Sequence, residues 1–296
     1  FPEYDWARQL TQGVDSVDLT LLVKNGTDLH SYQPSVKDIA AISRADVFCY
    51  VGGVSDTWVN DVLDTTENHT AKLVSMVDAA HADEEVLAEG MQDDDHHHHD
   101  HDHDHDHDAE EETELDEHVW LSLRRAQLAC AAMRDALCQA DPSHAEAYQA
   151  NYTAYAGQLQ ALDAEYQTMT ETAERSTIVV ADRFPFRYLA EDYGLTYYAA
   201  FPGCSAETEA SFETIVFLSD KVKSLGLSCV LTMEGSNHSL AKTILENAGT
   251  DGSILTLQAV SQSEIDQGAT YLSKMQENYS VLEKALNEGS RETWHN

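Results

Sequence analysis

The sequence predicts an α/β protein of two lobes, each a parallel sheet covered by helices, joined by one long rigid helix. In both halves of the 296-residue chain, short apolar segments alternate with segments of helical spacing, which is typical of parallel sheets. A long stretch almost free of glycine and proline separates the halves. We therefore expect an N-terminal lobe over residues 1–140, a connecting helix over 141–175 and a C-terminal lobe over 176–296.

The N-terminal lobe begins with strand-sized segments rich in β-branched and other apolar residues. They cover residues 17–23, 47–51 and 72–77. Helical spacing at 35–43 and 54–63 lies between them, and a further helix is predicted over 119–139. Strands that alternate with helices in this way form a parallel sheet.

The connecting helix starts where Asp141 and Pro142 supply an N-cap and a first-turn proline. Residues 143–174 contain no proline and only Gly157, so the helix can extend to about 48 Å. The C-terminal lobe repeats the alternation. Its predicted strands are 177–181, 196–201, 229–233 and 254–257, and its predicted helices are 186–192, 207–225, 238–247 and 265–287.

The charge balance limits the partners of the chain. It has 17 Lys and Arg against 53 Asp and Glu, a formal net charge of −36. Nucleic acids are close to excluded as partners and anionic membrane surfaces are disfavoured, because their recognition needs basic residues, whereas cations are favoured. No apolar stretch is long enough to span a bilayer. Since the chain opens on Phe1 rather than Met, we expect a targeting segment to be missing from it.

The five cysteines form no CxxC pair and are odd in number. This spacing does not support a thiolate zinc site or a disulfide framework. Cys204, in the run PGCS, is the one that the sequence places in polar surroundings, and its role stays open.

Residues 93–117 form an acidic, histidine-rich tract with eight histidines and fourteen acidic residues. Its single Leu cannot offset the entropy of ordering the segment, so we expect a mobile loop. Imidazoles next to carboxylates bind zinc in many equivalent ways, and a solvated linker is the alternative. The predicted weak metal ligands are His96, His97, His98, His99, His101, His103, His105 and His107.

Three histidines outside the tract share a position at predicted helix starts. His30 and His238 each follow a predicted strand, and His118 opens the helix after the tract. The ends of strands in open α/β sheets are the usual place for a ligand. We therefore interpret these three as candidate metal ligands, and the other histidines outside the tract as surface groups.

Several motifs resemble the zinc- and manganese-binding solute receptors of ABC transporters, the ZnuA/AdcA-like group. The run LHSYQPS over residues 29–35 resembles the first-ligand motif of that family, and EHVWL over 117–121 resembles the second. FRYLA over 186–190 with YGL over 193–195 resembles the third-ligand helix, and FPEYDW over 1–6 resembles the family's opening after its first strand.

This resemblance implies a function as well as a fold. The chain would be a non-enzymatic, monomeric receptor that binds zinc, Zn²⁺, with high affinity and delivers it to an ABC permease. It would lie outside the cytoplasm, either periplasmic or lipid-anchored on the outer face of the cytoplasmic membrane. The tract would gather zinc for the receptor.

The ligand set that the resemblance implies departs from the family pattern at one position. The third histidine position falls on Arg183, which stays protonated and does not bind cations. The fourth position, counted from Glu234, falls on His238. The implied set is His30, His118 and His238, with water or Asp182 in the last place. Three imidazoles favour zinc over manganese, which prefers carboxylates.

Alternatives to a zinc receptor remain. A receptor of the same family for manganese or another divalent metal is the nearest. A zinc-dependent hydrolase is more distant, because it needs a general base beside the metal-bound water, for which Glu234 is the candidate closest in sequence to a ligand. A surface adhesin is the third alternative, because receptors of this group are sometimes assigned that role.

Overall fold

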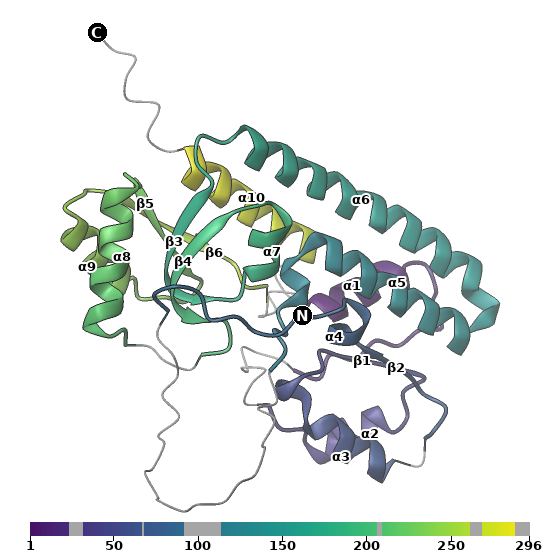
Figure 1. Ribbon diagram of the computed structural model, residues 1–296. Coiled ribbons are helices and arrows are strands. Elements are labelled where there is room, and N and C mark those ends of the chain that lie inside the picture. The colour runs from purple at the N-terminus through teal and green to yellow at the C-terminus, as the bar shows by residue number, and fades with distance from the viewer. Residues whose placement is uncertain (24–31, 67, 92–113, 206–208, 261–267, 288–296) are drawn as a thin grey trace, which may run out of the picture.

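The computed structural model describes residues 1–23, 32–66, 68–91, 114–205, 209–260 and 268–287. They form two lobes, with one long helix that runs past both (Figure 1). Each lobe holds a parallel sheet with helices packed on it. The predicted fold class is therefore confirmed.

The N-terminal lobe is built around two parallel strands, β1 (Val47–Tyr50) and β2 (Lys72–Ser75), paired so that Val47 lies opposite Lys72. Helices α2 (Val36–Ile42) and α3 (Trp58–Thr65) bury Ile42, Val59 and Val62 against Phe48 of β1. Ser35 begins α2 with a capping box, in which its hydroxyl and Asp38 exchange hydrogen bonds. This part of the lobe thus has a small core of its own.

Two of the remaining helices of the lobe pack against each other and against the long helix. α5 (Leu123–Ala140) packs against both strands, and α1 (Pro2–Leu10) packs against α5. The shorter helices are α4 (Met76–Ala79) and the 3₁₀ turns η2 (Val54–Asp56), η3 (Val119–Leu121) and η4 (Pro142–His144).

The strand predicted over residues 17–23 is wrong. The segment contains no strand, and all of its side chains are exposed or half-buried. Alternating apolar residues favour a strand only where a neighbouring strand supplies a hydrogen-bonding ladder. Within the described residues, β1 and β2 pair with each other and not with this segment.

The C-terminal lobe holds a four-stranded parallel sheet in the order β4-β3-β5-β6. Its strands are β3 (Thr177–Phe184), β4 (Thr196–Pro202), β5 (Cys229–Met233) and β6 (Ser253–Leu257). α8 (Phe212–Ser224) and α9 (Ser239–Ala248) cover one face, and α10 (Tyr271–Asn287) covers the other. The short helix α7 (Arg187–Asp192) connects β3 to β4.

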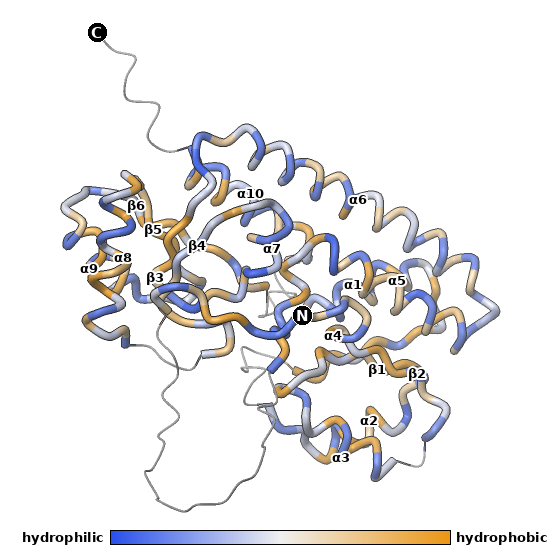
Figure 2. The backbone as a smooth tube through the Cα atoms, in the orientation of Figure 1, coloured by the Kyte–Doolittle hydropathy of each residue, from blue (hydrophilic) through white to orange (hydrophobic). Residues whose placement is uncertain are grey.

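The long helix is α6 (Ala145–Thr172), whose 28 residues span about 42 Å. Its buried residues recur three or four positions apart, from Tyr155 through Leu159 and Leu162 to Tyr166 and Met169, so one stripe faces the core. Hydrophilic and hydrophobic residues accordingly alternate along α6 in Figure 2. One hydrophobic cluster includes residues of α1, α5, α6, β3, β5 and α10, so the two lobes share a core.

In the described part of the chain, no helix is both long enough and apolar enough to span a bilayer.

Candidate metal centre

The predicted ligands divide into those that the structure describes and those that it does not. His30 and the eight histidines of the tract lie outside the described residues. His118, Asp182 and His238 are described, at the N-cap of η3, within β3 and at the N-cap of α9. Among the described residues, no three His, Cys, Asp or Glu side chains are grouped so as to hold a metal ion.

His118 is buried, with 5 % of its surface exposed, and its ring is oriented by a carboxylate. Its Nδ1 lies 2.9 Å from Oδ1 of Asp116, which also accepts the backbone N–H of His118 at 3.1 Å. A proton on Nδ1, donated to Asp116, leaves the lone pair of the ring on Nε2. A carboxylate that fixes the tautomer in this way is typical of metal-binding histidines.

The segment around His118 contacts both lobes. On one side, the backbone N–H of Ser55 donates to Oε1 of Glu117 at 2.8 Å, and the Ser55 hydroxyl donates to the same carboxylate. On the other side, Gly203, directly after β4, lies so close that an added Cβ would come within 2.9 Å of Cε1 of His118. His118 therefore lies where the two lobes meet.

His238 is held differently, by its backbone. It has φ 59° and ψ 10°, the left-handed conformation, at the N-cap of α9. A non-glycine residue rarely adopts this conformation, and such residues cluster at ligand sites. Its Nδ1 lies 3.2 Å from the hydroxyl of Thr232, a buried residue of β5. The tautomer that donates a proton from Nδ1 to that hydroxyl keeps its lone pair on Nε2.

Asp182 lies in β3 where the pairing with β4 is irregular, between Val180 and Arg183. Its Oδ1 accepts the backbone N–H of Arg183 at 2.9 Å, and its Oδ2 accepts that of Met233 at 3.2 Å. These bonds fix the carboxylate beside the end of β5. Each oxygen keeps a second lone pair, so the bonds are compatible with a metal contact.

Sequence reasoning did not single out the partners that orient the two imidazoles. Asp116 stands two residues before His118, but it is one of many acidic residues there, so its spacing did not mark it as a partner of His118. Thr232 stands six residues before His238, inside an apolar strand. Only the fold shows that each faces an imidazole.

Two further groups lie near His118. The Glu85 carboxyl accepts the backbone N–H of Cys204, and burial, with the nearby charge of Asp116, raises its pKa. Burial and nearby acidic groups, Glu85 first among them, also raise the pKa of the Cys204 thiol. At neutral pH this cysteine is therefore a thiol rather than a thiolate, and the thiolate is the metal ligand.

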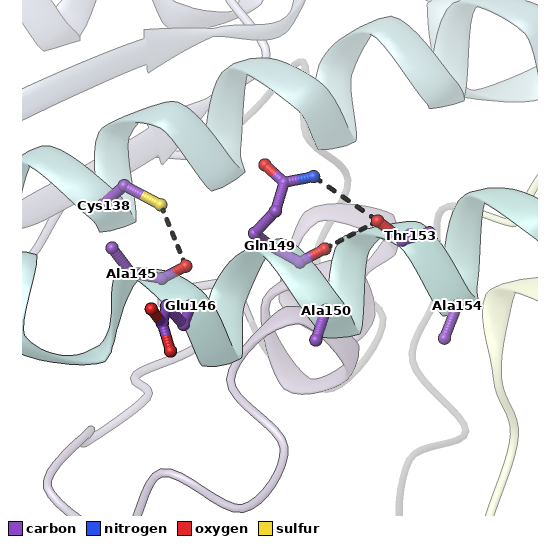
Figure 3. A pocket seen from close by; sticks show the side chains of 7 residues that line it. All are labelled: Cys138, Ala145, Glu146, Gln149, Ala150, Thr153 and Ala154. Carbon is purple, nitrogen blue, oxygen red and sulfur yellow. Dashed lines mark hydrogen bonds between the residues drawn. The ribbon is translucent and has the colours of Figure 1, made fainter.

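A groove between the end of α5 and the start of α6 is unrelated to this centre (Figure 3). Its residues are mostly alanines and uncharged polar groups with one carboxylate, Glu146, and the thiol of Cys138 donates to the carbonyl of Ala145 within it. This groove does not offer a set of metal ligands. Its lining residues are Cys138, Ala145, Glu146, Gln149, Ala150, Thr153 and Ala154.

Curated relatives share sequence over nearly the whole chain. The chain is 31 % identical to the zinc-binding lipoprotein AdcA of Streptococcus pneumoniae over 290 residues, 97 % of the chain and 55 % of that protein. It is 30 % identical to the high-affinity zinc uptake system protein ZnuA of Bacillus subtilis, over 97 % of the chain and 85 % of that protein. The chain thus spans about half the length of its AdcA relatives.

Solved structures share the fold. The Zn(II)-bound ZnuA-like domain of Streptococcus pneumoniae AdcA has a TM-score of 0.72 at 28 % identity, with 97 % of each chain covered. The metal-dependent lipoprotein YcdH of Bacillus subtilis has a TM-score of 0.74 at 26 % identity, with 97 % of this chain and 96 % of that chain covered.

A family model matches the chain as well. Its description is ZnuA, zinc-uptake complex component A, periplasmic, and it covers residues 1–285. The predicted resemblance is therefore confirmed, and the family is one of metal-binding receptors for transporters rather than enzymes. The chain belongs to the ZnuA family of zinc-uptake components.

Proposed function

We propose that this chain is a zinc receptor that binds one ion at the meeting of its lobes through His30, His118 and His238, with water or Asp182 in the fourth place. The observation that carries the proposal is the contact between His118 and Asp116. A buried imidazole with Nδ1 at 2.9 Å from a carboxylate presents Nε2 as a ligand.

The choice of zinc rests on ligand chemistry. Three imidazoles with one oxygen suit tetrahedral zinc, whereas manganese prefers sites rich in carboxylates. Glu234 is the candidate general base of the alternative hydrolase. Its Oε2 accepts a hydrogen bond from the backbone N–H of Ala259 at 2.7 Å, so this oxygen already has a structural partner. The relatives named as zinc-binding or zinc-uptake proteins support the same choice.

We also propose where the receptor works and what receives its zinc ion. The receptor passes its ion to an ABC permease and works outside the cytoplasm, in line with relatives described as a lipoprotein and as periplasmic. The histidine tract gathers further zinc ions with lower affinity, because its imidazoles alternate with carboxylates that attract cations.

Titration calorimetry with zinc tests the proposal on the full chain and on a variant in which residues 93–113 are replaced by a short Gly-Ser linker. The replacement stops before residue 114, because Glu114 and Leu115 pair with Glu85 and Glu84, and Asp116 orients His118. We expect the variant to keep one tight site and to lose the weaker ones. A variant that folds but binds no zinc tightly would overturn the proposal.

A further inference from the structure

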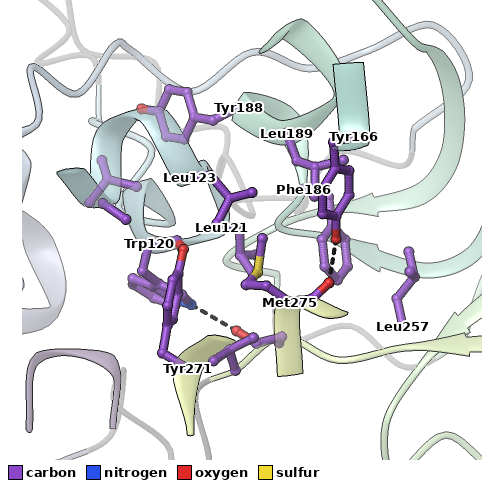
Figure 4. Packing of buried hydrophobic residues seen from close by; sticks show 14 of the residues in the cluster. Trp120, Leu121, Leu123, Tyr166, Phe186, Tyr188, Leu189, Leu257, Tyr271 and Met275 are labelled. Carbon is purple, nitrogen blue, oxygen red and sulfur yellow. Dashed lines mark hydrogen bonds between the residues drawn. The ribbon is translucent and has the colours of Figure 1, made fainter. Parts of the chain in front are cut away.

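Trp120 connects the segment of His118 to the C-terminal lobe. Its indole Nε1–H donates to the carbonyl of Ala259 at 2.7 Å, and its own carbonyl accepts the hydroxyl of Tyr271 at 2.6 Å. Trp120 and Tyr271 lie together in the buried cluster of Figure 4. The rings of Trp120 and His118 are 5.2 Å apart between centroids. Trp120 thus packs beside the His118 ring and also bonds to the C-terminal lobe.

Ala259 also connects to the segment of His238. Its backbone N–H donates to Oε2 of Glu234 at 2.7 Å, and the Glu234 N–H donates to the carbonyl of Leu257 at 3.0 Å. Glu234 directly follows β5 and stands four residues before His238. The two backbone groups of one alanine thus bind the side chain of Trp120, two residues after His118, and that of Glu234, four residues before His238.

The conformation around Ala259 is fixed from both sides. The next residue, Val260, is buried and has φ 59°, which is strained for a β-branched side chain. Asn278, fully buried, accepts the N–H of Gln258 at 2.7 Å and donates to its carbonyl at 2.8 Å. Strain of this kind persists only where the surroundings over-determine it, often at ligand sites. The connection is therefore a rigid one.

We propose that Trp120 and Glu234 are positioning residues that hold His118 and His238 at a fixed separation through the backbone of Ala259. This inference rests on the proposed function, since it assumes that both histidines bind the same ion. A site whose ligands are already in place loses less freedom on binding. Supporting groups of this kind also set ligand orientation, so the link favours one coordination geometry over others.

The test compares the wild-type chain with Trp120→Phe and Glu234→Leu, using zinc affinity and the visible absorption of bound Co²⁺, which reports ligand geometry. Glu234→Gln is the conservative variant, because its amide oxygen still accepts the Ala259 N–H. We expect Trp120→Phe and Glu234→Leu to weaken zinc binding about 10-fold and to change the cobalt spectrum. Glu234→Gln should keep both the zinc affinity and the cobalt spectrum near the wild-type values.

Tyr166→Phe is the matched control. It removes a buried bond of similar length, from the Tyr166 hydroxyl to the carbonyl of Met275 at 2.6 Å, in the same cluster (Figure 4). We expect it to lower Tm while leaving the cobalt spectrum unchanged. If the wild-type chain binds zinc but the cobalt spectra of Trp120→Phe and Glu234→Leu do not change, as in Tyr166→Phe, this inference alone is overturned. A wild-type chain that binds neither Zn²⁺ nor Co²⁺ would overturn the proposed function, and this inference with it.

Discussion

His118 and His238, the two described histidines that we propose as ligands, are held in place by different means. His118 is buried in a segment that contacts both lobes, and a carboxylate fixes its ring. His238 is half-buried, and the left-handed backbone of its own loop and a hydroxyl of its own lobe fix it. The position of His118 thus depends on the packing of the lobes, whereas that of His238 depends on local conformation.

This difference bears on how the centre would respond to change. A disturbance of the lobe boundary should reach His118 first, and a disturbance of the turn after β5 should reach His238. Trp120 and Glu234 both bind Ala259, and the positioning role that we propose for them would link the two histidines.

The largest expected effect comes from removing either imidazole. His118→Ala and His238→Ala should each weaken zinc binding by more than the roughly 10–100-fold that loss of a supporting residue costs, because a metal ligand itself is lost. His69→Ala, at an exposed position, is the control and should bind as the wild type does. Competition with a zinc chelator measures the affinities, and circular dichroism checks the fold. Equal affinity in all three variants would contradict the ligand assignment.

The next largest loss of zinc affinity is expected from changing the residues that orient the two imidazoles, Asp116 and Thr232. Asp116→Asn should weaken zinc binding about 10–100-fold, because the charge that stabilises the Nδ1–H tautomer is lost. Thr232→Val removes a neutral hydroxyl at 3.2 Å from His238 and should cost less than about tenfold, because hydrogen bonds to charged groups are the stronger ones. The same zinc competition assay applies. A larger loss from Thr232→Val than from Asp116→Asn would reverse the comparison.

Substitutions at two glycines distinguish an effect of packing on the site from an effect of local backbone conformation. Gly203→Ala brings a methyl within 2.9 Å of the His118 ring and should weaken zinc binding by displacing it. Gly235 has φ +80° with no atom within 4 Å of an added Cβ, so Gly235→Ala should lower the free energy of unfolding by about 1–2 kcal/mol through backbone strain. Urea unfolding and zinc titration of both variants distinguish the two effects. Strong zinc loss from Gly235→Ala with unchanged stability would show that the turn acts on the site directly.

The smallest effect concerns a second Asp–His pair, whose side chains are partly exposed. Nδ1 of His144 lies 2.6 Å from Oδ2 of Asp141, and hydrogen bonds from Ser143, His144 and Tyr148 lower the pKa of Asp141 to about 2. Since the pKa is lowered on folding, this stabilisation is present above the ordinary Asp pKa and is lost as pH falls through about 2.

Asp141→Asn should therefore lower Tm slightly at neutral pH, by less than Gly235→Ala does, and the difference from wild type should shrink between pH 4 and pH 2. Zinc affinity should not change, since this pair is remote from the proposed ligands. Thermal unfolding over that pH range is the measurement. A difference in Tm that grows as the pH falls would contradict the assignment.

Sequence patterns predicted most of the elements but not all. The segments that became β1, β2 and the four strands of the C-terminal sheet were recognisable because each is short, apolar and bounded by a helix. The strand predicted over 17–23 failed because apolar spacing does not reveal whether a neighbouring strand is present. Asp141 and Pro142, predicted to start the long helix, begin the 3₁₀ turn η4 instead, and α6 itself begins at Ala145.

By itself, the sequence determined the alternation of strands and helices, the long connecting helix, the family motifs and which histidines stand at helix starts. These features depend on neighbours a few residues apart, so local chemistry is enough. Only the tertiary structure decided which carboxylate and hydroxyl orient the imidazoles, that Gly203 lies against His118 and that Ala259 joins Trp120 to Glu234. Several of these partners are far apart along the chain and meet because the lobes pack on a shared core.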